Sequence, residues 1–200
     1  VHLVREEMLN GILASRRQFQ EKFGAAKQTV LTARRADAAL AADGLLPETA
    51  WGDVPWNSMQ SASDKHALSV AARFKALWEP ATLQLLIECD EPDMNLSATA
   101  AGRKNDDPDL WKDNDVEIFL AFEDRKIKCL ALYQLIVSDE GILTDLSKKL
   151  EVYDRGWTSH AKILVRKTPK GWTARVAIPW SSLGIEDPRT RWGSTLGTTY

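Results

Sequence analysis

The sequence has few of the features that would take it out of the class of ordinary globular domains. Two cysteines in 200 residues are too few for a disulfide framework or, by themselves, for a structural zinc site. No apolar run approaches the roughly 20 residues that a membrane-spanning helix needs, and the N-terminal residues lack the pattern of a signal peptide. With 44% hydrophobic and 27% charged residues, the composition excludes a disordered or collagenous chain. We therefore expect one globular domain, or one domain with an appendage.

The chain also lacks a large net charge of either sign. The 26 lysines and arginines nearly balance the 28 aspartates and glutamates, which leaves a formal charge of -2. A chain without a basic patch cannot gather the phosphates of a nucleic acid or the headgroups of an anionic membrane. We therefore expect neither a nucleic acid nor a membrane as a partner.

Recognisable catalytic motifs are absent as well. The three histidines are scattered, and the sequence contains no zinc-protease, nucleophile-elbow, phosphate-loop or dinucleotide-binding pattern. Asp115 and Glu117 could act as an acid and a base, because residues two apart on a strand share a face. Such a pair can equally accept hydrogen bonds from sugar hydroxyls or bind a cation. We favour a protein that is not an enzyme.

Tryptophan is the residue that the sequence has in excess, with 8 of the 16 aromatic side chains. Indole rings are enriched where a flat apolar surface meets a partly polar ligand. Four tryptophans lie in predicted strands or at their edges and are expected to pack in the core or at its rim: Trp51, Trp78, Trp172 and Trp180. Three others are left unassigned: Trp56, Trp157 and Trp192. The remaining one, Trp111, is a candidate for ligand binding.

Hydrophobic periodicity divides the chain into two parts. Residues 3–23 have the spacing of an amphipathic helix that ends at Gly24, so residues 1–27 are interpreted as an N-terminal helix, a linker or the tail of a preceding domain. Strand-like segments separated by turn residues fill residues 28–200, namely 29–36, 68–78, 82–90, 116–122, 126–138, 159–167, 173–179 and 191–196. Many short strands without long helices between them predict an all-β fold, an antiparallel β-sandwich preceded by that one α-helix.

One connection, residues 90–115, is too long for a hairpin and holds eight acidic side chains against three basic ones. Loops of this length in a compact domain are usually functional or disordered. Its carboxylates could ligate calcium, but no EF-hand spacing assigns the ligands. We favour a solvated acidic loop.

The loop leads into the segment that is richest in chemistry, residues 109–120. Trp111 is followed by short polar side chains and then by a strand in which Glu117 and Phe119 alternate with apolar residues. A flat ring beside carboxylates suits a pyranose, whose C–H face stacks on an aromatic ring and whose hydroxyls need polar partners. A second interpretation of the same segment is that Trp111 caps the core and Glu117 pairs with a lysine.

Four segments together resemble the family 9 carbohydrate-binding modules and their relatives: residues 43–51, 72–89, 111–120 and 171–184. Their order and spacing agree over about residues 30–200. The resemblance implies a jelly-roll-like β-sandwich that binds an oligosaccharide or polysaccharide without catalysis and is covalently attached to a polysaccharide-degrading enzyme such as a glycoside hydrolase. It also implies an extracellular or periplasmic location, no required cofactor, and structural calcium in some relatives.

The resemblance further implies roles for individual residues. In that family an aromatic residue at the position of Trp111 stacks on a terminal sugar ring, and an acidic residue at the position of Glu117 hydrogen-bonds the hydroxyls. The additional candidates for carbohydrate contacts are Asp115, Gln134 and Ser138.

The chain departs from the family pattern in several places. Ser138 stands where members commonly have Asn, and Ile136 where some have Arg, which predicts a weaker or differently selective site. The family's second stacking tryptophan and its closing strand would lie beyond Tyr200, so residues 28–200 are expected to lack the last strand. These departures keep open a structural accessory domain that binds no sugar.

A haem-binding sandwich for electron transfer is a further hypothesis. It would need two axial ligands, such as Met94 with His66 or His160, and their spacing does not support the pairing. Cys89 and Cys129 both lie in apolar runs and are expected to be buried core side chains, although a bridge between them is compatible with the sequence.

Overall fold

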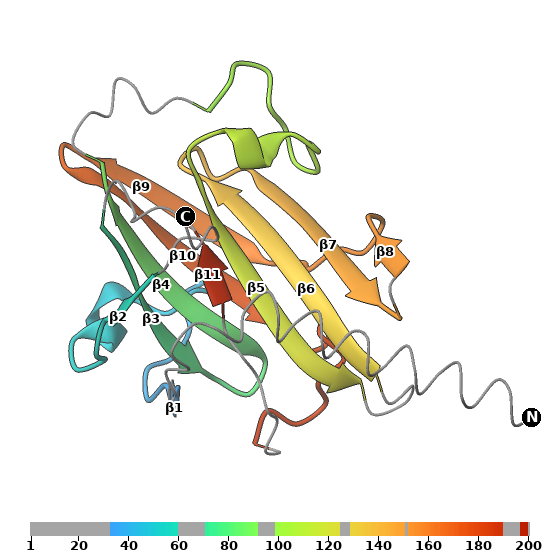
Figure 1. Ribbon diagram of the computed structural model, residues 1–200. Helices are drawn as coiled ribbons and strands as arrows, with labels where there is room; N and C mark the ends of the chain where they lie inside the picture. Colours follow the sequence, from blue (N-terminus) through green and yellow to red (C-terminus); the bar gives the residue numbers. More distant parts are fainter. Residues whose placement is uncertain are drawn as a thin grey trace, which may run out of the picture.

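Two β-sheets pack face to face in the computed structural model of this chain (Figure 1). The structure describes residues 33–59, 71–91, 99–124, 129–150, 152–189 and 197–199. Within these ranges the helical elements are two short 3-10 turns, η1 (Glu48–Trp51) and η2 (Leu110–Lys112). The all-β, two-layered architecture predicted from the strand pattern is confirmed.

The sheets are mostly antiparallel. Sheet A has the order β1-β3-β4-β10-β9 with β2 beside β3, and sheet B has the order β11-β5-β6-β7-β8. The strands of sheet A are β1 (Arg34–Arg35), β2 (Asn57–Ser58), β3 (Ala72–Trp78), β4 (Thr82–Asp90), β9 (Lys162–Thr168) and β10 (Gly171–Pro179). Those of sheet B are β5 (Asp115–Asp124), β6 (Cys129–Ser138), β7 (Leu143–Lys149), β8 (Val152–Asp154) and β11 (Gly197–Thr199). Only β1 and β3 pair in parallel within the described ranges.

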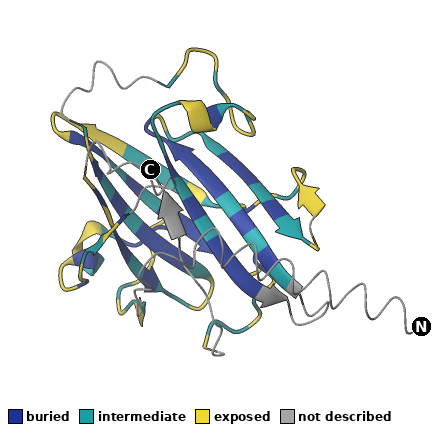
Figure 2. Cartoon of the chain, in the orientation of Figure 1, coloured by how far each residue is buried: buried dark blue, intermediate teal, exposed yellow. Residues whose placement is uncertain are grey.

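The core fills the space between the two sheets. Val116 and Ile118 of β5 are completely buried there, and Leu85 and Ile87 of β4 meet them from the other sheet. Figure 2 shows the buried residues concentrated in the central strands of both sheets. Because successive side chains of a strand point to opposite faces, the residues of β5 between the core positions lie on the outer face of sheet B.

The tryptophans expected in the core or at its rim are there. Trp51, Trp172 and Trp180 are buried, and Trp78 packs partly buried against the core.

Of the two cysteines, Cys89 is a buried free thiol, as expected for a core side chain, and burial raises its pKa. The side chain of Cys129 lies outside the part of the chain that the structure describes.

Some elements differ from those expected. The strands β7 and β8 were not predicted, because polar Asp145 and Ser147 stand on the inner side of β7 and break the alternation. The helix predicted over residues 3–23 lies outside the described residues, as do the strand segments 29–32 and 191–196. No helix long and apolar enough to cross a membrane occurs in the part of the chain that the structure describes.

Position 171, at the start of β10, requires a glycine because the backbone at the end of β4 approaches it closely. Its φ is +146°, and a Cβ added there would lie 2.0 Å from the carbonyl oxygen of Cys89. We expect Gly171→Ala to lower the free energy of unfolding by about 3 kcal/mol, because the pairing of β10 with β4 has to open. Urea denaturation measures the loss.

The matched control is Gly102→Ala, since Gly102 also has a positive φ, +89°, but no atom within 4 Å of an added Cβ. This control should cost only about 1 kcal/mol. Equal losses in the two variants would contradict the role of the backbone approach at Gly171.

Candidate functional site

The outer face of sheet B brings together several residues singled out by the sequence. Asp115, Glu117 and Phe119 of β5 point to this face, opposite to the buried Val116. Gln134 of β6 lies opposite Phe119 in the strand register. The face therefore combines polar and aromatic side chains on two neighbouring strands.

Glu117 and Gln134 contact each other directly across these strands. Gln134 Nε2 donates a 2.6 Å hydrogen bond to Glu117 Oε2. Both residues are half-buried. A carboxylate held by an amide has a fixed orientation, so the pair presents hydrogen-bonding groups in defined directions.

Trp111 projects from η2, the turn immediately before β5. It is 56% exposed, and it is the one exposed tryptophan among the described residues. The buried side chain of η2 is instead that of Leu110, which is completely buried. The ammonium of Lys112 lies 5.4 Å from the centroid of the indole and is ion-paired with Asp109 at 2.8 Å. Trp111 therefore offers an aromatic surface to solvent rather than capping the core.

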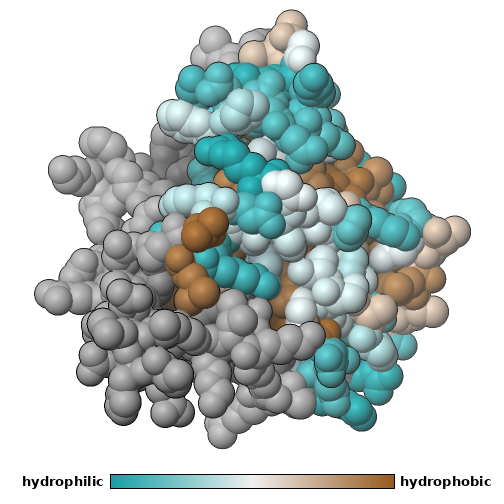
Figure 3. Space-filling model, turned by 90° about the vertical axis from the view of Figure 1, so that its right-hand side faces the viewer, coloured by the Kyte–Doolittle hydropathy of each residue, from teal (hydrophilic) through white to brown (hydrophobic). Residues whose placement is uncertain are grey.

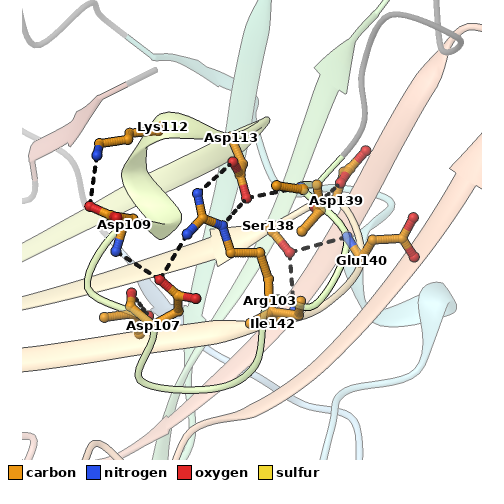
Figure 4. A network of polar contacts seen from close by, with 12 residues as sticks. Arg103, Asp107, Asp109, Lys112, Asp113, Ser138, Asp139, Glu140 and Ile142 are labelled. Carbon is orange, nitrogen blue, oxygen red and sulfur yellow. Dashed lines mark hydrogen bonds and ion pairs between the residues drawn. The ribbon is translucent and has the colours of Figure 1, made fainter.

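Carboxylates of the acidic loop are paired with cations of the same loop (Figure 4). Arg103 donates from Nε and Nη2 to the two oxygens of Asp113, at 2.8 and 3.1 Å, and from Nη1 to Asp107 Oδ1 at 2.9 Å. The hydrogen bonds from Arg103 lower the pKa of Asp113, and the hydrogen bond from Lys112 lowers the pKa of Asp109. The expectation of a solvated acidic loop did not include this pairing, and sequence reasoning assigned Arg103 no role.

Ser138 is placed differently from the other candidates. It is completely buried, and its Oγ accepts hydrogen bonds from the N–H groups of Glu140, at 3.3 Å, and Ile142, at 3.2 Å. These bonds close the turn between β6 and β7. The hydroxyl oxygen thus serves the turn, and in the strand register Ser138 lies opposite Asp115 rather than opposite Glu117.

Asp115 lies at the end of the outer face nearest to η2. Withdrawal from water raises the pKa of Asp115 to about 8, and the charges of Glu117 and Asp113 add to the effect. A carboxyl group with this pKa carries its proton at neutral pH and can donate a hydrogen bond, whereas Glu117 accepts one from Gln134. The neighbouring carboxyl groups therefore offer different hydrogen-bonding chemistry.

The metal-ligand and haem-ligand candidates have different outcomes. No group of three or more histidine, cysteine, aspartate or glutamate side chains that could hold a metal ion occurs there. His160 is exposed in the loop before β9. His66 and Met94, the other haem-ligand candidates, lie outside the described residues.

A pocket of about 220 Å³ lies at the β7–β8 edge of sheet B, away from Trp111. Its lining residues are Ser147, Lys149, Val152, Asp154 and Trp157. Trp157 packs against Tyr133, with ring centroids 4.9 Å apart, and donates from Nε1 to the carbonyl oxygen of Ser182 at 3.2 Å. Figure 3 views the molecule from this side, where apolar and hydrophilic residues are interspersed. Trp157, for which the sequence indicated no role, thus helps to close this edge of the core.

Comparisons with known proteins agree with this architecture. A family model described as "Carbohydrate family 9 binding domain-like" matches residues 42–197. A family 9 carbohydrate-binding module from Caldicellulosiruptor kristjanssonii, solved with glucose, is similar with 19% identity and a TM-score of 0.51, over 80% of this chain and 74% of that one. A "putative carbohydrate-binding protein" from Bacteroides uniformis ATCC 8492 has 12% identity and a TM-score of 0.56, over 84% of this chain and 89% of that one. No curated protein matches the sequence.

Proposed function

The chain belongs to the carbohydrate family 9 binding domain-like family, and from this premise we propose that it is a non-catalytic module that binds a sugar ring on Trp111. The observation that carries the proposal is the exposed indole of Trp111 on η2, a turn that lies against β5 and β6. The structural neighbour from Caldicellulosiruptor kristjanssonii was solved with glucose, and this supports a sugar as the class of ligand.

Stacking on Trp111 supplies the apolar part of the binding free energy. The C–H face of a pyranose covers the indole and removes apolar surface of both partners from water. Because the ammonium of Lys112 lies over the ring, the sugar either takes the opposite face or displaces the ammonium.

Hydrogen bonds on the outer face of sheet B supply the polar part. The paired side chains of Glu117 and Gln134 offer acceptors and donors to neighbouring hydroxyls of a sugar. Asp115, protonated at neutral pH, adds a donor at the end of the face nearest to Trp111. Ser138 contributes by shaping the turn, since its hydroxyl oxygen accepts two backbone hydrogen bonds there.

Binding of this kind suits a module that raises the local concentration of an attached enzyme near its substrate. We propose that the partner is a covalently attached polysaccharide-degrading enzyme, such as a glycoside hydrolase, and that the protein acts outside the cytoplasm. Asp115 and Glu117 then serve in binding and not as an acid–base pair.

Calorimetric titration of the chain with glucose and with xylo-, cello- and manno-oligosaccharides tests the proposal. We expect saturable heat with at least one series. Loss of binding when the reducing end is chemically reduced would identify a chain-end site. No heat with any of these sugars would contradict the proposal and favour a structural accessory domain.

Glu117→Gln separates the contribution of the carboxylate from that of the fold. The amide keeps the size of the side chain but removes the charged acceptor, so we expect the Kd for cellotriose to rise about tenfold or more. Calorimetry at constant pH measures the change. Glu48→Gln is the matched control, because Glu48 is exposed and paired with Arg166 of sheet A. An unchanged Kd for Glu117→Gln would remove Glu117 from the site.

A further inference from the structure

Arg103 makes the most hydrogen bonds to carboxylates of any described cation in the loop that carries Trp111. Its side chain is 16% exposed, and that of its partner Asp113 is 6% exposed. The guanidinium donates hydrogen bonds to both oxygens of Asp113 and to one oxygen of Asp107. Charge-assisted, bidentate bonds of this kind fix geometry as well as supplying energy. The low exposure of Arg103 and Asp113 reduces the screening that weakens ion pairs at the surface.

The two carboxylates that Arg103 joins lie on either side of η2 (Figure 4). Asp107 precedes the turn, and Asp113 follows it immediately. Asp107 Oδ1 also accepts the N–H of Asp109 at 2.9 Å. Asp113 Oδ2 accepts the N–H of Ala100 at 3.2 Å. The bonds from Arg103 thus join the two ends of segment 107–113 into a ring of ion pairs. This segment contains the three residues of η2, with Trp111 in the middle.

The loop segment that the ring of ion pairs closes is also attached to sheet B. Thr144 Oγ1 of β7 donates to the carbonyl oxygen of Asp107 at 2.8 Å, and the N–H of Asp106 donates to the carbonyl oxygen of Leu143 at 2.9 Å. Leu110, next to Trp111, is completely buried. The loop therefore has a fixed position on the sheet, and Arg103 connects its two halves.

We propose that Arg103 is a positioning residue, which holds Trp111 in place for sugar stacking by bridging Asp107 and Asp113. This inference rests on the proposed sugar-binding function. Binding to an indole that is already fixed in place avoids the entropic cost of ordering the loop when the sugar arrives. Arg103 itself touches no part of the stacked sugar in this arrangement and acts through Trp111.

Arg103→Gln tests the proposal, with Lys104→Gln as the matched control. Both variants lose one positive charge at neighbouring positions, but the exposed side chain of Lys104 lies outside the ring of ion pairs. We expect the Kd for cellotriose to rise about two- to tenfold in Arg103→Gln and to stay unchanged in Lys104→Gln. Calorimetry below the unfolding temperature of each variant separates this effect from a loss of stability.

A spectroscopic readout makes the test independent of sugar binding. Acrylamide quenching of Trp111 is obtained as the difference between each variant and the same variant with Trp111→Phe. Arg103→Gln should increase this quenching, because the indole becomes more mobile. If the parent chain does not bind cellotriose, the proposed function fails for that sugar, and the quenching still decides whether Arg103 positions Trp111.

Two results would overturn the proposal. One is unchanged quenching of Trp111 in Arg103→Gln. The other is complete recovery of the Kd and the quenching in Arg103→Lys, because a lysine keeps the charge but cannot bridge both carboxylates with a planar fork. Arg103→Lys also replaces Arg103→Gln if the latter does not fold.

Discussion

Trp111→Ala is expected to weaken binding of the best sugar ligand by about 50-fold or more. An indole face covers on the order of 100 Å² of apolar sugar surface, which at roughly 25 cal/mol per Å² is about 2.5 kcal/mol. The fold should tolerate the change, because Trp111 is 56% exposed and the core position beside it is filled by Leu110. Calorimetric titration gives the affinity, and thermal denaturation gives the stability.

Trp111→Phe is the matched control for this experiment. It keeps a flat aromatic ring of smaller area, so we expect it to retain much of the affinity. Sugar binding that survives unchanged in Trp111→Ala would place the site elsewhere on the molecule. A large fall in the melting temperature would instead show that Trp111 supports the fold.

Asp115→Asn is expected to change how the stability of the protein depends on pH. The pKa of Asp115 is raised from 3.8 to about 8, chiefly by burial. Between these two values the folded chain keeps a proton that the unfolded chain releases, so the unfolding free energy of the parent falls as the pH rises. A single such group contributes a loss of up to about 1.4 kcal/mol per pH unit across this window. Asparagine does not titrate, so the variant lacks this contribution.

Urea denaturation at pH 4.5, 6.0 and 7.5 measures the difference. We expect the stability of Asp115→Asn relative to the parent to increase at each step. Asp187→Asn is the matched control, because a hydrogen bond from Arg189 lowers the pKa of the partly exposed Asp187. The stabilising contribution of Asp187 changes only below about pH 3.8, so this variant should differ from the parent by nearly the same amount at all three pH values. Parallel pH profiles of Asp115→Asn and the parent would contradict the raised pKa.

The same ionisation is expected to affect sugar binding. Above the pKa of about 8, Asp115 loses the proton that it would donate and adds a negative charge beside Glu117. The affinity of the parent for a sugar should therefore fall between pH 7 and 9, and that of Asp115→Asn should not. Titrations at these two pH values make the comparison.

Strands that cross the middle of a sheet were predictable from local pattern. β4 and β10 are buried between neighbours, and their runs of apolar residues match the predicted segments 82–90 and 173–179 closely. β7 was not, because it lies next to the short strand β8 near the edge of sheet B, and polar residues such as Ser147 are accommodated on its inner side. A strand that is only partly enclosed does not need an alternating sequence.

The residues of the candidate site likewise differ in whether a local sequence pattern could predict their roles. Glu117 and Trp111 could be singled out because the alternation of β5 and the preceding polar turn are local features. Ser138 has the same position in its strand as a surface residue would have, and only the turn that follows it buries its hydroxyl. The role of Arg103 depends on Asp113, which is ten positions away and is brought back by the folding of the loop.

The sequence by itself determined the all-β class, the packing of the central strands and the segment in which a sugar site is to be sought. These properties follow from the alternation of apolar and polar residues, which acts between neighbours along the chain. The tertiary structure alone decided that Gln134 is paired with Glu117, that Ser138 is withdrawn from the surface and that Arg103 encloses the turn of Trp111. Such contacts depend on strand register and loop closure, which bring together residues that no local pattern connects.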